Sequence, residues 1–165
     1  MVQRADAGEV VGQRRIEIAP RETALSLYLK MEEAGVDLLA EMIPRIADGT
    51  APRIAQDQSR ASKFGGRRPE DGRIDWSWPA ARIDCLVRAV APPWPGAFGE
   101  IDGRRVDVHA GAPGVPFPEG GARPAPGTLR WHGDRPHIAV GDRWFRIDQA
   151  VGLEAASGGH ATKIL

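Results

Sequence analysis

The chain has 165 residues, and its 22 Lys and Arg side chains balance 22 Asp and Glu side chains, so the formal net charge is zero. Apolar residues make up 42% and charged residues 27%, which is typical of a folded protein, but 20 Gly and 14 Pro are too many for a helix bundle. The absence of a basic surplus argues against nucleic-acid binding over the whole surface, although not against a local basic patch.

No apolar run reaches the roughly 20 residues that a membrane span needs, and the first ten residues contain no apolar signal core. The single cysteine, Cys85, excludes an internal disulfide and a Cys-rich metal site. We therefore expect a cytoplasmic protein with no metal and no membrane partner.

The first 56 residues are predicted to form one folding unit. Residues 10–18 read as a strand, because Ile16 and Ile18 alternate with charged residues. Residues 22–47 read as a helix, because apolar residues recur at helical spacing and Gly49 lies where a C-cap prefers glycine. A strand, a turn and a long helix with one apolar face are typical of the end of a β-α unit.

Residues 57–73 are polar, basic and rich in glycine, and are predicted to be a linker. Two interpretations of their charge stay open. Either the linker is a solvated connector, or it is a clamp for phosphate. If it is a clamp, Arg67 is the leading candidate for the phosphate-binding residue, because a guanidinium matches phosphate geometry.

Residues 74–165 are predicted to form a second domain. Ser77 is a plausible N-cap for a helix ending near Val90, and Asp102-Gly103 marks a hairpin between residues 98–101 and 106–108. After a Pro- and Gly-rich loop at residues 110–127, short strands are expected at 128–131, 137–140 and 143–147. A helix that is followed by several short strands indicates a small barrel similar to an oligonucleotide/oligosaccharide-binding (OB) fold.

Common enzyme motifs are missing: there is no phosphate loop, dinucleotide fingerprint or nucleophile elbow. His132 and His137 flank a Gly-Asp turn and could meet across a hairpin. Two histidines without a third ligand make a poor zinc site, so ordinary surface histidines are the favoured interpretation.

Two segments are more distinctive. One is Arg-Ala-Asp-Ala-Gly at residues 4–8, and the other runs from Phe64 to the Pro-Trp-Pro-Gly-Ala-Phe of residues 93–98. Together they resemble the C-terminal half of the folate-dependent formyltransferases, clearly over residues 1–110 and weakly beyond. Within that family the two motifs most resemble those of the domain that formylates UDP-4-amino-4-deoxy-L-arabinose. Methionyl-tRNA formyltransferase is a more distant relative.

The resemblance implies an α/β remnant of a Rossmann-like formyltransferase domain (residues 1–56), the basic linker, and an OB-like β-barrel domain (residues 74–165), α+β overall. It implies transfer of a formyl group from 10-formyltetrahydrofolate to a primary amine by a trio of Asn, His and Asp. Asp6 falls in the motif that carries the Asp, whose role is to pair with the histidine and raise its pKa. The folate pocket would be lined by Val2, Gln3, Arg4, Ala5 and Asp6.

The resemblance also brings the segment of Trp94 near the acceptor, although packing at the junction of helix and barrel is the favoured interpretation of Trp94 alone. The Asn and His of the family precede the Asp, and here almost no sequence precedes Asp6. We therefore expect an N-terminally truncated chain that is inactive alone, or one half of a split enzyme.

A sugar-nucleotide amine is the first choice of acceptor, methionyl-tRNA is the runner-up, and a non-catalytic binding or assembly module is the alternative from another class. The apolar stripe of the helix at residues 22–47 lacks a sheet to cover and is expected to favour self-association.

Overall fold

The computed structural model describes residues 6–153, which fall into two compact units. The N-terminal unit comprises residues 6–22 and 26–66, and the C-terminal unit comprises residues 23–25 and 67–153. Residues 67–73, which the sequence assigned to the linker, are therefore grouped with the C-terminal unit. Neither long helix of the described residues is long and apolar enough to cross a membrane.

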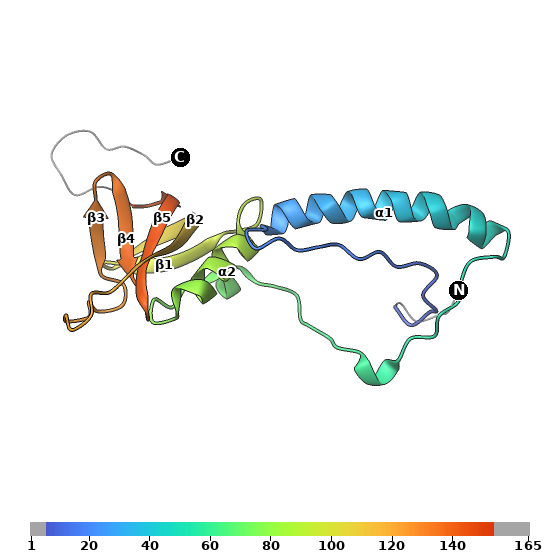
Figure 1. Cartoon of the computed structure of the whole chain (residues 1–165), viewed down its shortest axis with the longest axis horizontal. Coiled ribbons are helices and arrows are strands. Elements are labelled where there is room, and N and C mark those ends of the chain that lie inside the picture. The colour runs from blue at the N-terminus through green and yellow to red at the C-terminus, as the bar shows by residue number, and fades with distance from the viewer. Residues whose placement is uncertain (1–5, 154–165) are drawn as a thin grey trace. The chain divides into compact units, whose positions relative to one another are not determined.

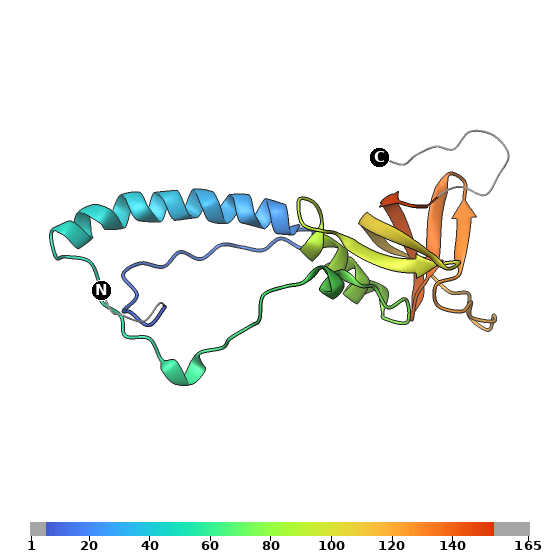
Figure 2. The same ribbon diagram turned by 180° about the vertical axis from the view of Figure 1, so that it is seen from behind.

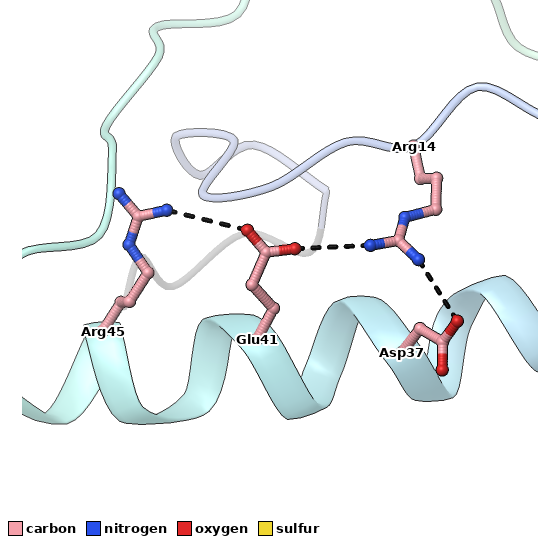
Figure 3. A network of polar contacts seen from close by, with 4 residues as sticks. All are labelled: Arg14, Asp37, Glu41 and Arg45. Atoms are coloured by element: carbon pink, nitrogen blue, oxygen red, sulfur yellow. Dashed lines mark hydrogen bonds and ion pairs between the residues drawn. The ribbon is translucent and has the colours of Figure 1, made fainter.

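The N-terminal unit is organised around one long helix, α1 (Ala24–Ala47), as the helical spacing predicted. An extended segment runs alongside it in both views (Figures 1 and 2). The guanidinium of Arg14 in that segment bonds the carboxylates of Asp37 and Glu41, each at 3.3 Å, and Glu41 also pairs with Arg45 (Figure 3). Ion pairs this exposed contribute little each, so the attachment depends on several acting together.

The start of α1 is fastened by Glu22. Its carboxylate accepts hydrogen bonds from the ammonium of Lys30, the hydroxyl of Ser26 and the backbone N–H of Ala19. These donors, Lys30 foremost, lower the pKa of Glu22 to about 2. A group of this kind favours the folded state only while it is ionised.

The prediction of a strand at residues 10–18 is wrong. Only Val10 makes a β-bridge, to Ile54, and residues 11–18 are extended without a described strand beside them. Alternation of apolar residues specifies an extended chain with two faces, but strand pairing needs a neighbouring backbone. The parallel sheet of a Rossmann-like remnant is likewise not seen among residues 6–153.

The C-terminal unit is a small α+β domain built on an open five-stranded antiparallel sheet (Figure 1). The closed barrel expected from the sequence is not seen among residues 6–153, because the first and third strands are the two edges of the sheet and do not pair. The strands are β1 (Ala97–Ile101), β2 (Arg104–Pro116), β3 (Leu129–His132), β4 (Arg135–Ala139) and β5 (Arg143–Val151), in the order β1-β2-β5-β4-β3. The hairpin at Asp102-Gly103 and the three later strands are confirmed.

Helix α2 (Ala80–Val90) packs against this sheet. Ile83 and Val87 on its inner face join Val108, Phe145 and Ile147 from the sheet in one core, and all five are at most 1% exposed. Because such a core is close-packed, it fixes where α2 ends and where the following loop begins.

Ser77 is not the cap of α2. Its hydroxyl bonds Asp75, and the carboxylate of Asp142, in the turn between β4 and β5, accepts the N–H of Ala80 at 2.7 Å. Burial raises the pKa of Asp142, but the hydrogen bonds from Ala80 and Arg143 outweigh burial and leave that pKa below its ordinary value. The helix is therefore capped from a residue 62 positions away.

The loop predicted for residues 110–127 begins later than expected. Strand β2 continues to Pro116 and pairs with β5 as far as Arg143, with three irregularities in register along the way. Prolines cannot donate to a ladder, but they are tolerated where bulges interrupt regular pairing. Composition alone therefore ended this strand too early.

Candidate functional site

The candidate site has two walls. The first wall is the short helix η2 (Pro69–Gly72), which follows directly after the arginine pair Arg67 and Arg68. The carboxylate of Asp71 accepts the backbone N–H of Arg68 at 2.8 Å, and the N–H of Asp71 bonds the carbonyl of Arg68 at 3.0 Å. This reciprocal pair of bonds fixes the backbone that carries both arginines, in the manner of a capping box.

The second wall is the loop from Ala91 to Gly96, which follows α2. The N–H of Trp94 bonds the carbonyl of Ala91 at 3.3 Å, and the N–H of Gly96 bonds the carbonyl of Val90 at 2.9 Å. Gly96 has a φ of 88°, a left-handed conformation that glycine adopts without steric cost. These contacts reverse the chain after the helix and hold Trp94 with 38% of its surface exposed.

The two walls touch through their glycines. A Cβ added to Gly72 would lie 2.5 Å from the carbonyl oxygen of Gly96, so only hydrogen fits between the two backbones. Just beyond, the N–H of Ile74 bonds the carbonyl of Phe98 at 2.6 Å. The arginine-bearing turn is thereby attached to the first strand of the sheet.

Between these walls lies a cavity of about 310 Å³. Arg67 and Trp94, which the sequence singled out on separate grounds, both line it. The remaining lining residues within 67–96 are Arg68, Pro69, Asp71, Gly72, Ala89, Val90, Pro95 and Gly96. The volume lies near the lower end of small-ligand pockets, whose apolar walls carry a few polar groups.

The electrostatics of the cavity favour an anion. Neither Arg67 nor Arg68 forms an ion pair with a residue of the described range 6–153, and the carboxylate of Asp71 is engaged by the N–H of Arg68. Guanidinium groups bind phosphate or carboxylate oxygens in a planar, bidentate geometry. With the indole of Trp94 beside them, they suit a ligand that joins an anionic group to a flat or apolar part.

Asp6 lies in the other unit. It is exposed, with a φ of 59° that Asp tolerates better than most residues, and the side-chain amide of Gln56 donates to the carbonyls of Asp6 and Gly8 at 3.1 and 2.6 Å. The other residues proposed for the folate pocket, Val2, Gln3, Arg4 and Ala5, lie outside the described residues.

Every described histidine (His109, His132 and His137) belongs to the C-terminal unit, whereas Asp6 belongs to the N-terminal unit. His132 and His137 do meet across the β3-β4 hairpin, with ring centroids 6.1 Å apart. Burial is the main cause that lowers the pKa of His137, and the nearby side chains of His132, Arg130 and Arg146 lower it further. Residues 6–153 contain no group of three potential ligands that could hold a metal ion there.

Sequence reasoning missed Gly72 and Asp142 as determinants of this region. Gly72 stands in the segment Pro-Glu-Asp-Gly, where a glycine after a polar turn is a usable signal. No local pattern could have paired Asp142 with Ala80, because the two meet only through the tertiary fold.

Residues 67–155 match the family model described as formyl transferase, C-terminal domain. The chain belongs to the formyltransferase family. The matched segment contains both Arg67 and Trp94, as well as α2 and the whole sheet, so the resemblance noted from the two sequence motifs is confirmed.

Solved structures share the fold at low identity. HypX from Aquifex aeolicus in complex with tetrahydrofolic acid is 20% identical with a TM-score of 0.67, over 90% of this chain and 25% of that one. An N-formyltransferase from Helicobacter canadensis, in complex with folinic acid and dTDP-3-aminofucose, is 18% identical with a TM-score of 0.60, over 86% and 51%. Methionyl-tRNA formyltransferase from Clostridium thermocellum is 18% identical with a TM-score of 0.53, over 68% and 47%. This chain spans between a quarter and about half of their lengths.

Proposed function

We propose that this chain is part of an enzyme that transfers a formyl group from 10-formyltetrahydrofolate to a primary amine, and that the amine belongs to a sugar nucleotide. The family membership of residues 67–155 supports formyl transfer, and the observation that carries the choice of acceptor is the cavity shared by Arg67 and Trp94. A sugar nucleotide joins phosphates to flat and apolar parts, as this cavity requires. The folate- and dTDP-aminofucose-bound relative points to the same chemistry.

In this proposal Asp6 is the carboxylate of the catalytic trio, in the C-terminal remnant of a Rossmann-like domain that precedes an OB-like one. A carboxylate beside an imidazole stabilises the cationic ring and fixes its tautomer. That histidine can then accept a proton as the amine attacks the formyl carbon, while the Asn stabilises the oxyanion. The segment of residues 2–6 would contact the folate with its backbone.

The chain contains no asparagine at any of its 165 positions. The oxyanion-stabilising member of the trio is therefore missing from this polypeptide, and removing one such donor typically costs a factor of about 100 to 1,000 in kcat. We propose that the chain does not catalyse formyl transfer alone and needs the remainder of a formyltransferase domain.

A methionyl-tRNA acceptor is the second candidate, favoured by the similarity to the Clostridium enzyme and by the two arginines, Arg67 and Arg68, that line the cavity. Phosphates of an RNA backbone would use the same guanidinium groups. The zero net charge of the chain favours the smaller acceptor.

The proposal is tested by calorimetric titration of the chain with UDP-4-amino-4-deoxy-L-arabinose, with a parallel turnover assay that adds 10-formyltetrahydrofolate. We expect saturable binding, no formylated product, and weaker binding by Arg67→Ala of about 1–3 kcal/mol, from loss of a charge-assisted bond. Arg60→Ala removes the same charge from the N-terminal unit and serves as the control.

Equal affinity of Arg67→Ala and the unchanged chain would assign Arg67 to a solvated connector. Binding of methionyl-tRNA but not of the sugar nucleotide would replace the first acceptor by the second. Product formed by the chain alone would refute its dependence on a missing asparagine.

A further inference from the structure

The outer face of the sheet, on the side away from α2, is basic at the end formed by β3, β4 and β5. Ile138 of β4 and Phe145 of β5 are paired and point into the core, so the residues next to them along each strand point outward. Five outward residues, which we call the β3-β5 basic patch, are Arg130, His132, Arg135, His137 and Arg146. The patch lies wholly within residues 67–155, the segment that matches the family's C-terminal domain.

Strand pairing places like charges directly opposite one another in this patch. Arg130 of β3 pairs with His137 of β4, and His137 pairs with Arg146 of β5 (Figure 1). Opposite residues of antiparallel strands have Cβ atoms about 4.5–5.5 Å apart, and like charges placed there destabilise a sheet. An anion bound at this row would remove the repulsion.

One carboxylate neutralises two of the three arginines. Asp148 of β5 accepts hydrogen bonds from Arg146 at 2.6 and 3.0 Å and forms an ion pair with Arg135 at 3.8 Å. Within residues 6–153, no carboxylate forms an ion pair with the remaining members of the patch, Arg130, His132 and His137, although Asp134 stands in the β3-β4 turn. These three groups are therefore available to an anion from outside the chain.

Aromatic rings hold Arg130 in position. Its guanidinium carbon lies 4.0 Å from the centroid of the Trp144 ring, and Phe117 meets that ring edge-on with centroids 5.7 Å apart. Trp144 is buried, so the support belongs to the packed part of the domain. A guanidinium stacked on an aromatic face keeps its N–H groups at its edge, where they can donate to oxygens of a ligand.

His137 becomes a donor to an anion only when its ring is cationic. Its Nδ1 lies 3.1 Å from the backbone carbonyl oxygen of Arg135, and a carbonyl can only accept a hydrogen bond. Nδ1 therefore carries the proton of the neutral ring, and Nε2 gains its own proton only in the cation. The neighbour from β2 is Gly114, which brings no charge.

The surroundings of His137 couple its proton to an anion. Burial is the main cause that lowers the pKa of His137, and three nearby basic side chains of the patch lower it further. An anion among the same side chains would act in the opposite direction, because it stabilises the cationic ring. Binding of an anion and uptake of a proton at His137 therefore favour each other.

The number of available donors favours a phosphate monoester. Arg130, His132 and His137 lie on one face of the β3-β4 hairpin, and the two imidazole centroids are 6.1 Å apart. A phosphate monoester offers three acceptor oxygens and nearly two negative charges, whereas each phosphodiester of a nucleic acid carries one charge. We propose that the β3-β5 basic patch binds the phosphate monoester group of a small molecule, and that His137 takes up a proton as the group binds.

An NMR titration of the histidine rings in the whole chain tests the proposal, because it reports on the patch separately from the cavity of Arg67. Sulfate is the first probe, since its charge does not change over the range of about pH 5–8 in which histidine titrates. Sodium chloride at equal ionic strength is the blank. We expect saturating sulfate to raise the pKa of His137 by at least about 1, so that sulfate binds about tenfold more tightly at the acidic end of this range.

A pair of arginine variants tests the geometry of the patch. Arg130→Gln is expected to weaken sulfate binding by about tenfold or more, from loss of a charge-assisted bond. Arg105→Gln is the matched control, because the guanidinium carbon of Arg105 also lies over an aromatic ring, 3.8 Å from the centroid of Phe98, but pairs with Asp107 at the other end of the sheet. It removes the same charge and is expected to leave the affinity unchanged.

Methyl phosphate and dimethyl phosphate compare the monoester with the diester. We expect the monoester to bind at least about tenfold more tightly, because it carries the additional charge and oxygen. AMP and glucose 6-phosphate carry the same group on a nucleoside and on a sugar, so the tighter of the two identifies the source of the phosphate.

A pKa of His137 that sulfate leaves unchanged would overturn the proposal, and this measurement needs no variant, so it stays decisive if a variant unfolds. Equal weakening by Arg130→Gln and Arg105→Gln would also overturn it, because binding would then follow overall charge. Equal binding of methyl and dimethyl phosphate would replace the small-molecule ligand by a nucleic-acid backbone.

Discussion

Replacing Gly72 by alanine is expected to disrupt the cavity without touching any of its polar groups. The added Cβ would lie 2.5 Å from the carbonyl oxygen of Gly96, and real Cβ contacts are essentially never shorter than 3.0 Å. The η2 turn and the loop before β1 must therefore separate by at least 0.5 Å. Both atoms in conflict are backbone-attached, so no side-chain rotation relieves the overlap, and overpacking of this kind costs about 1–3 kcal/mol.

Thermal unfolding followed by tryptophan fluorescence measures this cost. All five tryptophans lie in the C-terminal unit, so the signal reports on that unit. We expect the midpoint of Gly72→Ala to fall by at least about 4 °C, and the quantum yield of Trp94 to change because its loop moves. Gly65→Ala is the control, since nothing lies within 4 Å of a Cβ at that position. A midpoint within about 1 °C of the parent chain would refute the close contact between the two walls.

Two further predictions concern the ends of the helices. Asp142→Ala is expected to destabilise the C-terminal unit by about 1 kcal/mol, because Ala80 loses its cap, whereas Asp142→Asn keeps an acceptor and most of the stability. Urea denaturation measures both, and an alanine variant as stable as the asparagine variant would contradict capping by Asp142. The pKa of Glu22 is lowered from 4.5 to about 2, so its stabilising effect on α1 is complete above pH 4.5 and disappears as the pH falls toward 2. Far-UV circular dichroism should show helix loss in that range, less steeply in Glu22→Gln than in the control Glu33→Gln, and identical curves for both would remove Glu22 from this role.

The local elements could be read from the sequence because their signals are local. Periodicity identified α1 close to its observed bounds, and Asp102-Gly103 located the first hairpin, since a tight turn needs only the residues within it. The two motifs identified the family for the same reason: each is a short run of residues. Arg67 and Trp94 stand in the second of these runs, and the sequence alone carries no sign of a contact between their segments.

Local sequence patterns do not determine which strands pair. Two predictions show this: the strand expected at residues 10–18 and the early end expected for β2. Alternation describes the two faces of one chain, whereas a strand exists only beside another strand. Within residues 10–18 only Val10 forms a bridge, to Ile54. In β2 the pairing with β5 carried the strand through prolines that composition treats as breakers.

By itself, the sequence determined the helices, the hairpin, the family and the residue types of the candidate site, because those properties depend on neighbours along the chain. Only the tertiary structure decided that Arg67 and Trp94 share one cavity and that Asp142 caps a helix far away in sequence. Each of these depends on contacts between distant segments, which no local pattern records; at Gly72, for example, an added Cβ would lie 2.5 Å from the carbonyl oxygen of Gly96.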